Sequence, residues 1–140
     1  MVADPSDELA AYTLTRGDPS FIHQHVVDTR AIRTATAETA RITVAQALVG
    51  LYLHVEHGFT GRQVQRVHQL LANERPEWPA FSLPDDRGRM RVEEVLAEPP
   101  GERRDGAIHR WARSTWEACS GLRNEVAAFL SANGITVGRR

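Results

Sequence analysis

The chain has 140 residues, a formal net charge of −1 at pH 7 and 41% hydrophobic residues. This size suits one domain with a hydrophobic core, and the nearly neutral charge gives no strong attraction to nucleic acid or to an anionic membrane. All 17 basic residues are arginine, so chemistry that needs a lysine, such as Schiff-base formation, is excluded. The single cysteine, Cys119, excludes an intrachain disulfide and a paired-cysteine site.

The first residues, MVADPSDELAA, are acidic and lack the apolar segment of a signal peptide. The longest apolar stretch, residues 44–55, is interrupted and too short to cross a bilayer. We therefore expect a cytoplasmic protein that does not bind membranes. Residues 1–5 and 135–140 are expected to be frayed termini.

Two helices are predicted in the N-terminal part of the chain. Ser6 is a suitable cap for a helix over residues 7–16, and Asp18 followed by Pro19 favours a second helix from residue 19 to about 34. His25 lies near the centre of the apolar arc of this second helix, whereas His23 and Asp28 lie at its borders. The polar residues 34–41 follow as a loop or a frayed helix end.

A central pair of helices is predicted over residues 42–57 and from Thr60 to about residue 74. Apolar residues recur at helical spacing in the first, and Gly58 is suited to end it. Thr60 and Gln63 fit the capping box that begins the second. His54 ends a stripe of small residues and is expected at a helix contact. His68 lies on the buried face of the second helix, where an unpaired imidazole nitrogen would cost about 1–3 kcal/mol.

The C-terminal half begins with a connector over residues 75–88 that contains three prolines and is therefore not helical. Helices are predicted over residues 92–98, 102–119 and 122–133, and no segment alternates long enough to build a sheet. The pattern predicts an all-α, single-domain bundle of five or six helices over residues 1–140, with a proline-rich connector.

The sharpest functional hypothesis is a site inside the bundle. His25, His54 and His68 come from three successive predicted helices, and helical bundles build metal sites from side chains on facing helices. Together with Asp28, and with His23 as a further candidate, they would suit zinc or iron. Three alternatives stay open. The histidines could be structural core residues, could bind a small molecule, or His23 or His25 could act as a general base oriented by Asp28.

Two other classes of function compete with this site. Residues 60–74 resemble the second helix of a helix-turn-helix, with Arg62, Gln63 and Arg66 at the positions of base readers, but the neutral net charge argues against DNA binding. An interaction or homodimerisation module is the main alternative. Its face would hold the aromatic residues Trp78, Phe81, Trp111 and Trp116, which core packing explains equally well. Cys119 is predicted to be an inert core residue. The sequence does not decide whether the protein is an enzyme, nor what its substrate would be.

Four segments resemble a bacterial family known only as a domain of unknown function. They are IHQHVVD, with His23 and Asp28; LHVE at residues 53–56; RVEEVL at residues 91–96; and HRWARSTW, with Arg110, Trp111 and Trp116. The resemblance covers residues 18–130 and implies no known reaction. The segment after Asp28 departs from the family pattern, because Thr29, Arg30, Arg33 and Thr34 replace an A-Y-x-x-Q-H sequence. A cysteine pair of longer members is also lacking, which implies that a metal site built on those groups would be lost or altered here.

Overall fold

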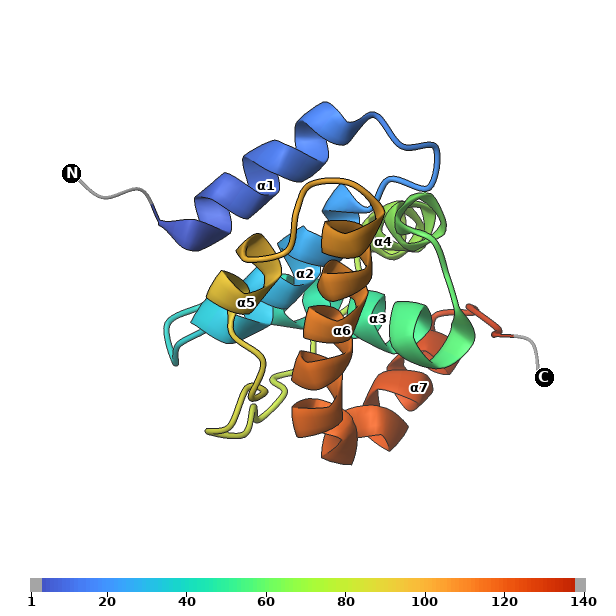
Figure 1. Cartoon of the computed structure of the whole chain (residues 1–140). Coiled ribbons are helices and arrows are strands. Elements are labelled where there is room, and N and C mark those ends of the chain that lie inside the picture. The colour runs from blue at the N-terminus through green and yellow to red at the C-terminus, as the bar shows by residue number, and fades with distance from the viewer. Residues whose placement is uncertain (1–3, 138–140) are drawn as a thin grey trace.

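The computed structural model describes residues 4–137, and within this range it contains helices and no strands (Figure 1). The all-α prediction is therefore confirmed. Six helices of ten or more residues and one short helix follow in chain order: α1 (Pro5–Arg16), α2 (His23–Thr34), α3 (Arg41–His57), α4 (Gly61–Glu74), α5 (Val92–Leu96), α6 (Glu102–Cys119) and α7 (Arg123–Ala132). None of the helices within residues 4–137 combines the length and the apolar character of a membrane span.

Helix α3 occupies the centre of the molecule, with α6 crossing in front of it in Figure 1. Its residues from Val44 to Leu53 are buried except for the half-buried Gln46. Helices α2, α4, α6 and α7 all pack against α3, so it is covered on several sides rather than on one stripe. This explains why the apolar stripe and the stripe of small residues are both inside, because each faces a different neighbouring helix.

The pair α2 and α3 determines which side chains can meet. The short loop over residues 35–40 reverses the chain, so the two helices are antiparallel, and the start of α2 lies beside the end of α3. Gly50 marks their close approach, since a Cβ atom there would overlap the carboxyl group of Asp28 on α2. It would also lie 3.1 Å from Cγ1 of Val64 on α4. Three helices thus converge at this glycine.

The first two helices begin at different residues from those predicted. Asp4, not Ser6, caps α1, because its carboxylate accepts hydrogen bonds from the amide and hydroxyl groups of Ser6. Helix α2 begins at His23 rather than at residue 19. Phe21 has a φ of 59°, in the left-handed region, and this interrupts the helix that Asp18 and Pro19 were expected to start. The Asp18 carboxylate instead accepts a hydrogen bond from the amide of Ile22.

Other boundaries agree with the sequence. Gly58 adopts the left-handed conformation, with a φ of 69°, and ends α3. Thr60 and Gln63 form the predicted capping box at the start of α4. Helix α6 spans the predicted residues, and a short 3₁₀ turn, Ser120–Leu122, separates it from α7. The short α5 ends at Leu96, two residues before the predicted end.

The aromatic residues of the predicted interaction face lie mainly in the core. The side chains of Trp111 and Trp116 are each only 2% exposed. Trp78 and Phe81 of the connector are half-buried, and their rings lie 5.7 and 6.5 Å from the ring of Phe129 on α7. The two α6 tryptophans therefore stabilise the bundle from inside. A homodimer stays a prediction, but it would need a surface other than these two side chains.

Glu56 gives the buried Trp116 its hydrogen-bond partner. One carboxylate oxygen accepts a hydrogen bond of 2.7 Å from the Trp116 indole N–H and one of 2.9 Å from Nε of Arg123. We expect Glu56→Ala to lower the free energy of unfolding by about 1–3 kcal/mol, because the indole N–H would lose its acceptor inside the protein. Glu56→Gln retains an acceptor oxygen and should lose clearly less. Urea denaturation of both variants tests this, and equal losses would contradict it.

Candidate histidine site

Three histidines from three helices lie together at one end of the α2–α3 pair. His25 is in the first turn of α2, His54 is near the end of α3, and the antiparallel arrangement places the two rings in contact. They stack with 3.5 Å between ring centroids and 16° between planes. His109 of α6 completes the group, with its ring centroid 5.0 Å from that of His54 and 5.8 Å from that of His25.

Hydrogen bonds determine where the protons of this cluster reside. Nδ1 of His54 lies 3.0 Å from the carbonyl oxygen of Phe59. A carbonyl only accepts, so Nδ1 carries the proton and Nε2 of His54 has the free electron pair. Nδ1 of His109 lies 3.0 Å from this Nε2 and therefore donates to it. Phe59 is held in place because its amide bonds to the carbonyl of Leu53, just after the Gly58 turn.

Burial keeps the cluster uncharged at neutral pH. Desolvation lowers the pKa of His25 to about 2, and the neighbouring His54 and His109 act in the same direction. Desolvation also lowers the pKa of His54 to about 4, although its hydrogen bond to the Phe59 carbonyl opposes this. The pKa of His109 is lowered as well, mainly by desolvation. His25 and His54 are therefore uncharged at pH 7, and the lowered pKa of His109 favours its neutral form, which has the free electron pair that a metal ligand requires.

The three histidines of the cluster differ in their exposure to solvent. His25 is only 3% exposed, and its Nδ1 is buried without a hydrogen-bond partner among residues 4–137. His54 is half-buried, and His109 is exposed to solvent. A small ligand would therefore approach from the side of His109 and meet His25 last.

Asp28 lies elsewhere and has a different partner. Its Oδ1 accepts a hydrogen bond of 3.0 Å from Nε2 of Gln24, one turn earlier on α2. Its Oδ2 is buried and has no partner within the described part of the chain. Desolvation raises the pKa of this carboxyl well above its usual value, since the Gln24 bond only partly opposes it. Burial therefore favours the protonated form of Asp28, which packs against Gly50 and is bonded to Gln24 rather than to a histidine.

His23 and His68 also bond away from the cluster. Nδ1 of His23 lies 2.9 Å from the hydroxyl of Thr13 on α1. Nε2 of His68 donates to the carbonyl of Gln46 at 2.7 Å, and the Gln46 amide donates to the carbonyl of His68 at 3.0 Å. This reciprocal pair joins α3 to α4. Of the predicted ligand set, the structure thus brings only His25 and His54 together.

The present ring positions do not form a finished metal site. Among residues 4–137, no group of three or more histidine, cysteine, aspartate or glutamate side chains is arranged to hold a metal ion. The stacked His25 and His54 rings explain this for the cluster, because parallel faces do not aim two nitrogens at one point.

Cys119 is buried and burial raises the pKa of its thiol, which agrees with its expected role in the core.

His109 is the member of the cluster that the sequence analysis missed. It lies at the edge of the apolar stripe of α6, beside the buried Ile108, and nothing in its local sequence distinguishes it from a solvated histidine. The crossing of α6 over both α2 and α3 brings it to His54. His109 could have been predicted as a member of the cluster only if the neighbouring helices of the bundle had been known.

Two of the predicted base-reading residues of α4 make contacts with other residues of the protein. Nε of Arg62 donates to the carbonyl of Pro19 at 3.0 Å, and its guanidinium lies 5.6 Å from the centre of the Phe21 ring. Gln63 belongs to the capping box. Arg62 and Gln63 therefore join α4 to the preceding loops.

Comparisons with known proteins place the chain in a family. A comparison with curated proteins and a comparison with solved structures both found no match. A model of a family of unknown function, DUF5946, matches residues 4–120, which include helices α1 to α6 and all three clustered histidines. The match covers most of the chain and agrees with the resemblance seen in its sequence. The protein belongs to this family, DUF5946.

Proposed function

We propose that this protein binds a divalent transition-metal ion, zinc in the first instance, through His25, His54 and His109. The observation that supports the proposal is the gathering of three uncharged imidazoles from three different helices within 6 Å of one another. Neutral imidazole is a common ligand of zinc, iron and copper. Asp28 and His68 are not included in the set, because each is bonded to another residue.

The spacing of two nitrogens already suits a metal. Tetrahedral zinc, with Zn–N bonds of about 2.0–2.1 Å, separates its ligand nitrogens by about 3.3 Å. Nε2 of His54 and Nδ1 of His109 are 3.0 Å apart, so a metal that replaced the shared proton would change this separation by only a few tenths of an ångström, and each ring would turn by about 35° to direct its nitrogen at the ion. The Phe59 carbonyl would then be the outer partner that orients His54, a usual feature of histidine ligands.

His25 would have to tilt out of its stack to become the third ligand. This movement breaks no hydrogen bond of its Nδ1, since that atom is without a partner in the described part of the chain. Coordination would instead satisfy a buried polar atom whose isolation is unfavourable. Three protein ligands leave one coordination position of zinc for a molecule from solution, as in catalytic zinc sites.

The test is zinc binding by tag-free protein, measured by isothermal titration and by elemental analysis after dialysis. We expect one zinc per chain, and a loss of affinity of more than about tenfold in His109→Ala and in His25→Ala, because each removes a ligand. Substitution by cobalt should give the visible absorption of a tetrahedral site. His68→Ala is the matched control, since it removes a half-buried histidine outside the cluster and should retain zinc.

Three results would contradict the proposal: absence of binding, binding that His109→Ala leaves intact, or equal losses in His68→Ala and His109→Ala. Far-ultraviolet circular dichroism of each variant shows whether it has remained folded. His109 is exposed, so its replacement should leave the fold intact even where that of His25 does not.

A further inference from the structure

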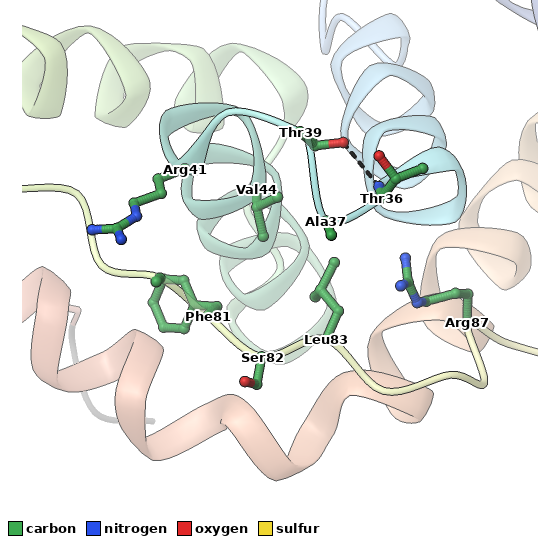
Figure 2. A pocket seen from close by; sticks show the side chains of 10 residues that line it. Thr36, Ala37, Thr39, Arg41, Val44, Phe81, Ser82, Leu83 and Arg87 are labelled. Carbon is green, nitrogen blue, oxygen red and sulfur yellow. Dashed lines mark hydrogen bonds between the residues drawn. The ribbon is translucent and has the colours of Figure 1, made fainter.

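We propose that a second site, at the opposite end of the α2–α3 pair, binds the carboxylate of a small molecule that also carries an apolar group. The site is a cavity of about 490 Å³ between the loop over residues 35–40, the first turns of α3 and the connector residues 80–87 (Figure 2). Ligand pockets in proteins commonly have volumes of about 300–1,000 Å³. The cavity is thus large enough for a metabolite.

The charged side chains that line this cavity are both arginines, Arg41 and Arg87, and no acidic residue lines it. Glu38, Asp85 and Asp86 lie on the bordering loops but are not among its lining residues. The lining itself therefore carries two positive charges and no negative charge. Such a lining favours an anionic ligand.

Arg87 is held in place before any ligand arrives. Its Nε donates to the carbonyl of Pro84, and its Nη1 donates to the carbonyls of Ile32 and Ala35 at the end of α2. These bonds hold the guanidinium against the wall of the cavity and leave the second amino group, Nη2, for a ligand. A fixed arginine loses little conformational freedom on binding, which makes it an effective partner for a carboxylate.

The start of α3 and the loop before it provide further donors. Arg41 starts α3, and in Figure 2 its side chain lies at the end of the cavity away from Arg87, with its guanidinium pointing away from Val44. The N-cap residue of α3 is Ala40, and no side chain caps this 17-residue helix, so its positive end is available beside the cavity. The hydroxyl groups of Thr36 and Thr39 lie on the same loop.

The rest of the lining is apolar except for Ser82, and it determines the second half of the ligand. Val44, Phe81 and Leu83 lie between the two arginines in Figure 2, together with two alanines of the lining. An inorganic anion would occupy only the polar edge and leave these side chains uncovered. A ligand with a carboxylate and an aromatic or branched body, such as an arylacetic acid, would contact both parts.

This site is independent of the histidine cluster. Residues 41 and 54 are separated by 13 positions of α3, which corresponds to about 20 Å along the helix. Loss of zinc binding should therefore leave carboxylate binding intact, and loss of carboxylate binding should leave zinc binding intact. His109→Ala, which should weaken zinc binding by more than about tenfold, is expected to bind a carboxylate probe normally.

The experiment is a titration of the full chain with phenylacetate, followed by the amide chemical shifts of the ¹⁵N-labelled protein. We expect shifts confined to residues 36–44 and 80–87, and a decrease in affinity of about tenfold in Arg87→Gln, which removes the fixed guanidinium. The amide spectrum of the variant also shows whether it has remained folded. Arg66→Gln, an exposed arginine of α4 outside the cavity, is the matched control and should bind normally. Ala80→Trp should block binding by filling the cavity, and Ala80 is exposed, so the fold should tolerate it.

Two further probes test separately the contribution of the ligand charge and that of the apolar wall. Phenylacetamide has the same shape without the charge and should bind at least about tenfold more weakly than phenylacetate. Inorganic phosphate should also bind weakly, because it does not reach the apolar wall. The proposal is overturned if phenylacetate causes no shifts up to its solubility, if folded Arg87→Gln and Arg66→Gln bind equally, or if phosphate or phenylacetamide binds as well as phenylacetate.

Discussion

Gly50→Ala is expected to lower the free energy of unfolding by about 1–3 kcal/mol, although alanine is the better helix former by about 1 kcal/mol. A Cβ atom at residue 50 would overlap the carboxyl group of Asp28 and lie 3.1 Å from Cγ1 of Val64. Asp28 is fully buried beside Gln24, so its side chain has little room to move. Helices α2 and α4 would therefore have to move away from α3. Urea denaturation of the variant measures the loss.

A matched control and a double-mutant cycle show whether the Asp28 contact is the cause. Gly121→Ala places a methyl group where no atom lies within 4 Å and should change stability by less than about 0.5 kcal/mol. In an Asp28→Ala background the overlapping carboxyl group is absent, and most of the cost of Gly50→Ala should disappear. If the cost were the same in both backgrounds, the close approach of α2 and α3 at this glycine would not explain it.

The free energy of unfolding should fall as the pH decreases from about 6.5 towards 4. In the folded state the pKa of His25 is lowered to about 2 and that of His54 to about 4, whereas both are near 6.5 in the unfolded chain. Between these values the unfolded chain binds protons that the folded protein does not, so acidification favours unfolding. His25, only 3% exposed, contributes a slope approaching about 1.4 kcal/mol per pH unit. The half-buried His54 adds a smaller slope of the same sign.

Asp28 acts in the opposite direction over part of this range. Its pKa is raised in the folded protein, so the stability that its proton contributes is complete below about pH 3.9 and is lost as the pH rises through the raised value. Unfolding should therefore be compared between pH 7.5 and 4.5 in Asp28→Asn and in Asp28→Asn with His25→Leu, both in metal-free buffer with a chelator. The second protein should have the shallower slope, by about one proton. Equal slopes would show that His25 is not a buried neutral group.

Because the chain belongs to DUF5946, both proposed sites can also be tested in other members of this family. The family model covers residues 4–120, which contain the histidine cluster and the arginine-lined cavity. Zinc binding would assign a chemistry to the histidine cluster, and phenylacetate binding would assign a ligand class to the cavity. Because the sites lie at opposite ends of α3, single substitutions such as His109→Ala and Arg87→Gln assign each activity separately.

The sequence by itself determined the helical class and most of the boundaries. Gly58, the Thr60–Gln63 capping box and the prolines of the connector act through local backbone geometry, so their effects could be predicted without knowing any neighbour. The boundary at the start of α2 could not, because the left-handed conformation of Phe21 is not a usual choice for an aromatic residue. It is fixed by contacts with α4, where the Arg62 amide bonds to the carbonyl of Ser20.

Only the tertiary structure decided which histidines meet. Helical periodicity does not distinguish His25, His54 and His68 from one another, because each lies on or beside a buried helical face. The antiparallel pairing of α2 and α3 brings the first two together, the packing of α4 directs His68 to the Gln46 carbonyl, and the crossing of α6 adds His109. Helical periodicity specifies which face of a helix is buried but not which helix covers it. A site built from several helices is therefore determined by the packing of the bundle.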